Sequence, residues 1–258
     1  MSIQQTSTEQ VDLAVLGTVV RVHLDDPQDR DFVESAWHLC LLGAGVRQVP
    51  SQRIVTLKAS LNEQARLVGL TSLTQAVTRA AIAEQGGRLL MFHAGALSNL
   101  ETGATVAYVA AGGTGKTTIT TTLGRGRGYI SDETVAVTRA GEVQPYPKPL
   151  SVRRDGGGKD EVPPGALGLR SAKRAPWLSG LYAVRRDPHH TGPATARQVA
   201  LLDAIALLSP ETSALAALPE PLRSMRDVLE RVGGLVQVTY REATQLEDLL
   251  TEALESRS

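Results

Sequence analysis

The sequence predicts an α/β fold in which a mixed sheet is flanked by helices, with a small α+β region at the N-terminus. The first of three supporting observations is that short β-prone apolar runs alternate with segments of helical periodicity along most of the 258 residues. A glycine-rich turn at 110–115 also stands between one such run and a helix-forming segment. Finally, residues 1–87 contain strand and helix patterns of their own. We therefore expect an N-terminal region, 1–87, packed on a larger domain, 88–258.

The sequence of the N-terminal region, 1–87, predicts a polar tail followed by strands and helices. They are a polar, disordered tail at 1–10, a strand pair or one bent strand at 11–24, a helix at 28–42, a strand at 54–57 and a long helix at 63–85. Gly17 marks the break within the first β-prone run, and Gly86-Gly87 ends the long helix. Cys40 stands in an apolar run, which favours a buried structural thiol.

The larger region alternates between predicted strands and helices. These are a strand at 88–97, a strand at 106–109 that forms a hairpin with it, a helix ending at Leu123, a strand at 129–133, a hairpin at 135–143, a strand at 181–186, helices at 196–208 and 221–232, a strand at 235–240 and a helix at 244–254. Residues 153–176 are rich in glycine, proline and basic residues, which predicts a mobile basic loop. Two interpretations of this loop stay open: a solvated linker, or a flap that closes over phosphates or the acceptor.

Composition narrows the functional classes. Lys plus Arg and Asp plus Glu both total 27, so the formal net charge is zero, which argues against non-specific nucleic-acid binding. A single cysteine excludes an intramolecular disulfide and a cysteine-rich metal site. The first ten residues lack the apolar centre of a signal peptide, and no apolar run reaches the ~18 residues of a membrane span. We expect a cytoplasmic protein with no nucleic-acid or membrane partner.

The segment 106–118, Val-Ala-Tyr-Val-Ala-Ala-Gly-Gly-Thr-Gly-Lys-Thr-Thr, carries the clearest chemistry. Its order of apolar strand, glycine-rich turn and helix is the context in which a P-loop binds nucleotide phosphates. Glycines let the backbone wrap a phosphate, and amides at the start of the helix point at the anion. Lys116 would reach the β- and γ-phosphates of ATP, and the Thr117 hydroxyl would join the ligands of Mg²⁺. The predicted phosphate contacts are Gly112, Gly113, Thr114, Gly115, Lys116, Thr117 and Thr118.

One position departs from the P-loop pattern, because Ala110 stands where the first glycine is expected. A methyl group is tolerable there if the residue is still extended, since no positive φ is then needed. The alternative interpretation of the whole segment is a surface turn that happens to contain Gly-Lys-Thr.

Two acidic residues, Asp132 and Glu133, stand at the end of the next predicted strand. Phosphoryl transfer needs a metal ion beside the phosphates, and a carboxylate at the end of a neighbouring strand usually holds it. Because adjacent strand residues point to opposite faces, we expect Asp132 to face the nucleotide and Glu133 to assist through water or the metal. The predicted metal ligands are thus Thr117, Asp132 and Glu133. The alternative is two solvated acids in a turn.

A histidine strand, Phe92-His93-Ala94-Gly95-Ala96, precedes the loop, and the acidic strand end at 130–135 follows it. Together with the Gly-Lys-Thr-Thr of the loop, these residues resemble the kinase domain of the HPr kinase/phosphorylase family and its shorter relatives. The later segment Pro145-Tyr-Pro-Lys-Pro-Leu150 also resembles a recurring segment of the short relatives. The resemblance covers about residues 88 to 245, and residues 1–87 are unlike the N-terminal domain of the bacterial protein kinases in that family.

This resemblance implies an α/β P-loop kinase of the HPr kinase-like type that uses ATP and Mg²⁺. In that family a strand-end aspartate acts as general base on the acceptor hydroxyl, a role that falls to Asp132, with Glu133 in place of a second aspartate. His93 would lie close to the active centre and hydrogen-bond that carboxylate or the γ-phosphate; the alternative is a satisfied core histidine. The implied catalytic residues are Asp132, His93 and Lys116. The family's glycine-rich signature after the basic loop is not found, so HPr itself is not the expected acceptor.

The function that we expect is ATP-dependent transfer of a phosphoryl group to a serine- or threonine-type hydroxyl. The acceptor would be a hydroxyl-bearing peptide, an amino acid or another small molecule. Two alternatives stay open: a P-loop ATPase or GTPase switch with a conformational output, and a non-catalytic nucleotide-binding component of a biosynthetic complex. Members of the family often form hexamers, so a homo-oligomer is one of the expected assembly states.

Overall fold

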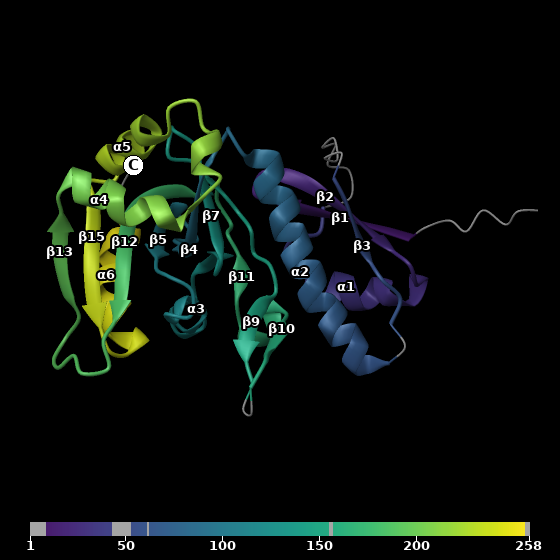
Figure 1. The fold of residues 1–258 in the computed structure, drawn as a ribbon. Coiled ribbons are helices and arrows are strands. Elements are labelled where there is room, and N and C mark those ends of the chain that lie inside the picture. Colours follow the sequence, from purple (N-terminus) through teal and green to yellow (C-terminus); the bar gives the residue numbers. More distant parts are fainter. Residues whose placement is uncertain (1–8, 43–52, 61, 155–156, 256–258) are drawn as a thin grey trace, which may run out of the picture.

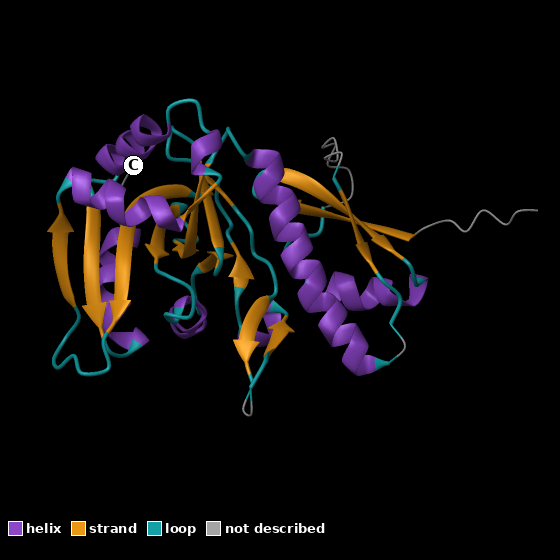
Figure 2. Cartoon of the chain, viewed as in Figure 1, coloured by secondary structure: helices purple, strands orange, loops and turns teal. Residues whose placement is uncertain are grey.

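The computed structural model describes residues 9–42, 53–60, 62–154 and 157–255. They form a large mixed sheet with helices on both faces and a smaller sheet, with the long helix α2 (Glu63–Gln85) between the two (Figures 1 and 2). None of the described helices is both long and apolar enough to cross a lipid bilayer. The predicted α/β class, with a mixed sheet flanked by helices, is therefore confirmed.

The smaller sheet consists of β1 (Glu9–Val15), β2 (Thr18–Leu24) and β3 (Ile54–Leu57). β1 and β2 are antiparallel, and β3 runs parallel to β2. The turn between β1 and β2 holds Leu16 and Gly17 at φ of 49° and 74°, which confirms a strand pair with its break at Gly17. Residues 1–8 of the expected tail lie outside the described residues. The tail was predicted too long, because β1 already begins at Glu9.

The predicted helix at 28–42 is wrong over its second half. The structure has a 3₁₀ turn (Pro27–Asp29) followed by α1 (Arg30–Ala36). Beyond Trp37 the chain turns back, and the Cys40 carbonyl accepts a hydrogen bond of 2.7 Å from the amide of Ala14 in β1. Trp37 and Cys40 are both buried, so packing against β1 outweighs the helical spacing. Burial raises the pKa of the Cys40 thiol, in line with its expected structural role.

The larger sheet has the strand order β11–β6–β4–β5–β12–β15–β13, and the short strands β7 and β14 pair with β4 while β8 pairs with β7. Their bounds are β4 (Leu90–Ser98), β5 (Ala104–Val109), β6 (Gly128–Ser131), β7 (Thr134–Val137), β8 (Val143–Gln144), β11 (Arg170–Ser171), β12 (Trp177–Arg186), β13 (Thr195–Val199), β14 (Thr212–Ser213) and β15 (Leu235–Tyr240). β5, β12 and β15 run parallel, whereas β4 is antiparallel to both β5 and β6. The C-terminal ends of β5 and β6 therefore lie at the same edge, with β4 between them.

Helices cover both faces of this sheet. On one face, α3 (Lys116–Leu123) and α6 (Glu247–Leu254), the latter preceded by a 3₁₀ turn (Ala243–Leu246), bury one apolar cluster. On the other face, α4 (Leu201–Leu208) and α5 (Pro221–Arg231) bury a second. A third cluster joins the N-terminal sheet and α2 to the larger region, because it includes Met91, Ala136 and Tyr146. The N-terminal region is thus packed on the part of the sheet formed by β4 and β7.

Two predictions in the second half of the chain are wrong. The expected loop at 153–176 contains regular elements, and with its flanks it forms β9 (Leu150–Arg153), β10 (Lys159–Val162), a 3₁₀ turn (Pro164–Leu167) and β11. Leu150 and Leu169 are buried around Tyr129, so apolar residues anchor this basic segment. The expected helix at 196–208 begins only at Leu201, because residues 195–199 pair with β15 as strand β13.

Candidate functional site

The candidate site lies at the sheet edge where β5 and β6 end. The glycine loop, residues 110–115, leaves β5 and enters α3, and Asp132 directly follows β6. His93 lies on β4 between them, one residue before the register pair Ala94–Val109. Neighbouring strands are ~4.8 Å apart, so the loop, His93 and Asp132 occupy three adjacent strand positions. The structure thus brings these sequence-predicted residues to one edge.

Two residues of the glycine loop have a backbone conformation that favours glycine. Gly113 and Gly115 have φ of +81° and +98°, a region in which residues with a Cβ atom are strained. Ala110 is not among the positive-φ residues of the described chain, so alanine is accommodated at this position. A Cβ atom added to Gly112 would meet nothing within 4 Å, so an anion can approach the loop from that open side.

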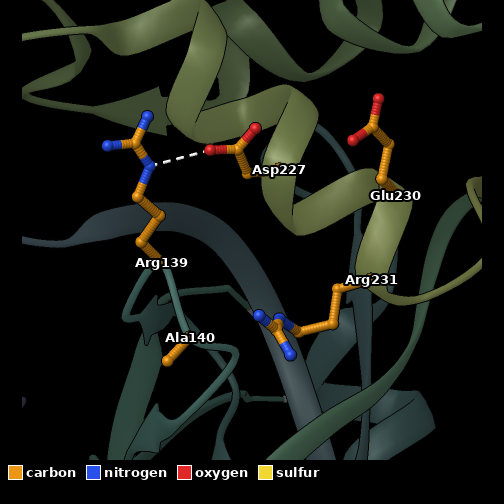
Figure 3. Close-up of a pocket in the computed structure, with 5 residues that line it drawn as sticks. All are labelled: Arg139, Ala140, Asp227, Glu230 and Arg231. Carbon is orange, nitrogen blue, oxygen red and sulfur yellow. Dashed lines mark hydrogen bonds and ion pairs between the residues drawn. The ribbon is translucent and has the colours of Figure 1, made fainter.

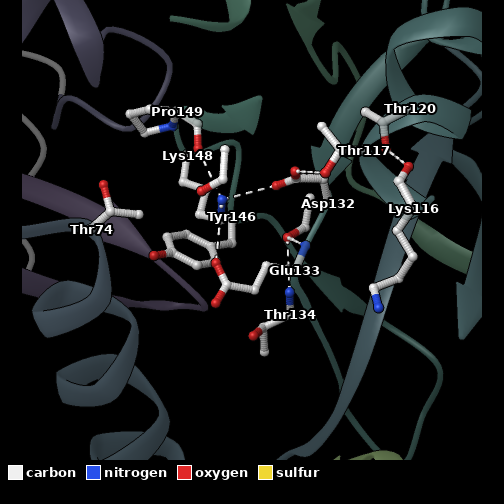
Figure 4. A network of polar contacts seen from close by, with 12 residues as sticks. Thr74, Lys116, Thr117, Thr120, Asp132, Glu133, Thr134, Tyr146, Lys148 and Pro149 are labelled. Carbon is white, nitrogen blue, oxygen red and sulfur yellow. Dashed lines mark hydrogen bonds and ion pairs between the residues drawn. The ribbon is translucent and has the colours of Figure 1, made fainter. Parts of the chain in front are cut away.

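The Lys116 side chain folds back over the loop. Its ammonium donates to the carbonyls of Ala110 and Ala111 over 2.5 and 3.3 Å, and it points away from Asp132 (Figure 4). Burial lowers the pKa of Lys116, and the charges of Glu211 and Asp132 offset this in part. A phosphate chain would offer the ammonium charged acceptors, which are stronger than these two neutral carbonyls. Lys116 is therefore poised to exchange its present partners for an anion in the loop.

Thr117 and Asp132 connect the start of α3 with the end of β6. Thr117 Oγ1 donates to Asp132 Oδ2 over 2.8 Å (Figure 4), and the buried Tyr129 hydroxyl donates to Oδ1 over 3.1 Å. The Asp132 side chain is 3% exposed, whereas that of Glu133 is 36% exposed. Asp132 is therefore the more buried of the two acids, and it contacts the residue that follows Lys116.

Lys148 is a site residue to which sequence reasoning assigned no role. Its side chain is almost fully buried, and its ammonium lies 3.0 Å from Asp132 Oδ1 and 3.2 Å from Glu133 Oε2 (Figure 4). It also donates to the carbonyl of Pro149 over 2.9 Å. Burial lowers the pKa of Lys148, but the charges of Asp132, Glu133 and Glu161 raise it more, so the net pKa is raised. Its signals in the sequence were its place between two prolines, at 147–149, and the resemblance of the segment 145–150 to one that recurs in the short relatives.

His93 is half-buried beside these groups. It pairs in register with Thr134 on β7, directly after Asp132 and Glu133. Burial, followed by the charge of Lys116, lowers the pKa of His93, while Glu211 and Glu133 act in the opposite direction. The neutral imidazole is therefore favoured near neutral pH, and a neutral ring can both donate and accept a hydrogen bond.

Glu211 is a second residue that sequence reasoning missed. It ends a 3₁₀ turn (Ser209–Glu211) and precedes β14, whose Thr212 pairs with Phe92 on β4. This register places Glu211 beside His93, on the opposite side from β7. Its charge raises the pKa of both His93 and Lys116. No local pattern marks Glu211, because only the pairing of β14 with β4 brings it to the site.

The oxygen ligands at this edge fit Mg²⁺. The described residues contain no group of three or more histidine, cysteine or acidic side chains that could hold a metal. Mg²⁺ needs no such group, because it is usually held by one or two protein ligands together with phosphate oxygens and water. Thr117 Oγ1 and Asp132 Oδ2 are suitable hard ligands on the loop side of the carboxylate. Glu133, the third predicted ligand, contacts Lys148, and no contact joins it to Thr117.

A surface hollow elsewhere contains none of these residues. It lies between the β7–β8 turn and α5 and is lined by Arg139, Ala140, Asp227, Glu230 and Arg231 (Figure 3). Arg139 pairs with Asp227 over 2.8 Å and with Glu220 over 3.3 Å, so opposite charges at this hollow already neutralise one another.

Comparison with known proteins does not identify the chain. No protein-family model matches the sequence, and no curated protein is significantly similar to it.

Proposed function

We propose that this protein is an ATP-dependent P-loop kinase, similar to the HPr kinase type, that transfers the γ-phosphoryl group to a serine- or threonine-type hydroxyl. The acceptor would be a peptide, an amino acid or another small molecule. The 2.8 Å hydrogen bond between Thr117 and Asp132 carries the proposal. It joins a hydroxyl that follows a glycine loop to a buried strand-end carboxylate, and such a pair holds Mg²⁺ in P-loop enzymes.

The residues of the site have different roles in the proposed transfer, and Asp132 has two. The loop amides and Lys116 hold the β- and γ-phosphates. The acceptor oxygen forms a bond to the γ-phosphorus while the bond from that phosphorus to the β–γ bridging oxygen breaks. The electron pair leaves with ADP, and the acceptor proton passes to Asp132. Thr117 and Asp132 would hold Mg²⁺, which supplies positive charge beside the transferring group.

Lys148 supports this scheme because it fixes Asp132. Its ammonium lies 3.0 Å from Oδ1, so Oδ2 stays on the Thr117 side. A carboxylate that is already held in place loses little freedom when the metal and the acceptor arrive. His93, on the strand between the loop and Asp132, would hydrogen-bond that carboxylate or the γ-phosphate.

Binding and transfer together test the proposal. The wild-type protein is titrated with Mg-ATP and then incubated with free L-serine and with serine-containing peptides, while ADP release and the mass of each acceptor are followed. We expect ATP to bind and an accepted compound to gain the mass of one phosphoryl group. Absence of ATP binding would refute the proposal.

The same experiment separates the two alternatives. ADP release that is equally fast without any acceptor would favour an ATPase or GTPase switch. ATP binding without turnover, left unaltered by Asp132→Asn, would favour a non-catalytic nucleotide-binding component.

A further inference from the structure

The β9–β10 hairpin has two faces of different character. β9 and β10 are antiparallel, and Arg153 stands opposite Lys159. Because side chains alternate along a strand, Arg154 and Asp160 lie on the other face, where they form an ion pair of 3.2 Å. The hairpin contacts α3, the helix that follows the glycine loop (Figure 1). The hairpin therefore lies beside the helix that starts at the glycine loop.

The Arg153 face is turned toward the glycine loop. A Cβ atom placed on Gly113 would lie 3.7 Å from Arg153 Nη2, so the guanidinium lies against the loop. Burial is the main cause of the lowered pKa of Lys116, and the charge of Lys159 lowers it further. The same face carries Glu161, whose charge acts on Lys148 beside Asp132. The hairpin thus lies on the Asp132 side of the loop.

Arg153 and Lys159, two like charges, stand opposite each other on the two strands of the hairpin. Neither Arg153 nor Lys159 has a carboxylate partner within the part of the chain that the structure describes. Like charges directly opposite on neighbouring strands destabilise the strand pair. Lys116 adds a third cation, whose hydrogen-bond acceptors are neutral carbonyls. A multivalent anion among these three side chains would remove the repulsion and gain charged hydrogen bonds.

We propose that Arg153 binds the γ-phosphate of a nucleotide held in the glycine loop, so that the site selects a triphosphate over a diphosphate. This inference rests on the proposed function. The terminal phosphate has to lie on the Asp132 side, because the acceptor must reach both groups at once, and Arg153 reaches the loop from that side. Arginine suits the task because its planar guanidinium can bond two phosphate oxygens together.

Arg153→Gln is compared with Arg154→Gln, which removes the same charge from the opposite face of the same hairpin. Calorimetric titration measures the affinity of wild type and both variants for Mg-ADP and for the Mg complex of a β,γ-imido ATP analogue. We expect Arg153→Gln to weaken triphosphate binding about 10- to 100-fold, the effect of one charged hydrogen-bonded contact, and ADP binding less than about threefold. Arg154→Gln is expected to change neither affinity by more than about threefold.

If Arg153→Gln binds the triphosphate analogue as tightly as the wild type does, the inference is wrong, while the proposed function stands. The same holds if Arg153→Gln loses equal affinity for both nucleotides. Arg153→Lys keeps the charge without the planar guanidinium and is expected to recover part of the lost affinity. Thermal unfolding of each variant checks that the domain stays folded. If the wild-type protein binds neither nucleotide, the proposed function and this inference fail together.

Discussion

The ammonium of Lys148 lies 3.0 Å from Oδ1 of Asp132, and their side chains are only 1% and 3% exposed. Glu133 completes the group at 3.2 Å from the same ammonium. Removing two charges from water is costly, so each of them depends on its partners to remain buried. The stability of the fold and the position of Asp132 are therefore linked through Lys148.

Lys148→Met should lower the free energy of unfolding by about 3–5 kcal/mol, because it leaves the Asp132 carboxylate buried without its cation. Urea denaturation followed by circular dichroism measures the change. Lys58→Met is a suitable control, since the Lys58 side chain is 83% exposed and its ion pair with Asp25 is at the surface. If Lys148→Met costs no more than this control, the buried ion pair does not stabilise the fold as described.

Asp132→Asn should retain ATP binding and lower acceptor-dependent transfer by about 10²–10⁴-fold, because an amide cannot take the acceptor proton. Glu133→Gln should have a smaller effect, since Glu133 is more exposed and has no contact with Thr117. ADP release with an accepted hydroxyl compound measures both variants. A larger loss for Glu133→Gln would move the role of base from Asp132 to Glu133.

The stability of the protein should depend on pH through His93. Its pKa is lowered from 6.5 by burial and by Lys116, against the opposite effects of Glu211 and Glu133, so the unfolded chain binds more protons in this range. The contribution of neutral His93 to the free energy of unfolding is complete above pH 6.5. This contribution is lost as the pH falls from 6.5 through the pKa of His93 in the folded state. Denaturation midpoints between pH 7.5 and 5.5 should therefore fall less in His93→Gln than in the wild type. Equal pH dependence in both proteins would remove His93 as the cause.

Helices and strands were predicted correctly where the apolar periodicity and the stop residues both lie within one segment of the sequence. The helix at 63–85 has the predicted bounds because helical periodicity and its glycine stop agree. The helix predicted at 28–42 ends at Ala36, because pairing with β1 and burial of Trp37 compete with the local pattern. The strand at 195–199 depends on pairing with β15, which no local pattern reveals.

The residues of the candidate site fall into the same two groups, those marked by a local pattern and those placed by tertiary packing. The glycine loop, Thr117, Asp132 and His93 belong to short segments whose order along the chain places them at one sheet edge. Lys148, Glu211 and Arg153 reach that edge only through tertiary packing of their own segments. Residue type alone does not distinguish them from surface charges.

Titration of Lys116→Ala with Mg-ATP tests the central claim most directly. This variant removes the ammonium that would contact the β- and γ-phosphates and leaves the glycine backbone in place. The account predicts a loss of ATP affinity of about 10- to 100-fold relative to wild type, while Lys58→Ala binds as the wild type does. Wild-type affinity in Lys116→Ala would contradict the account, because the loop would then not be the place where the nucleotide binds.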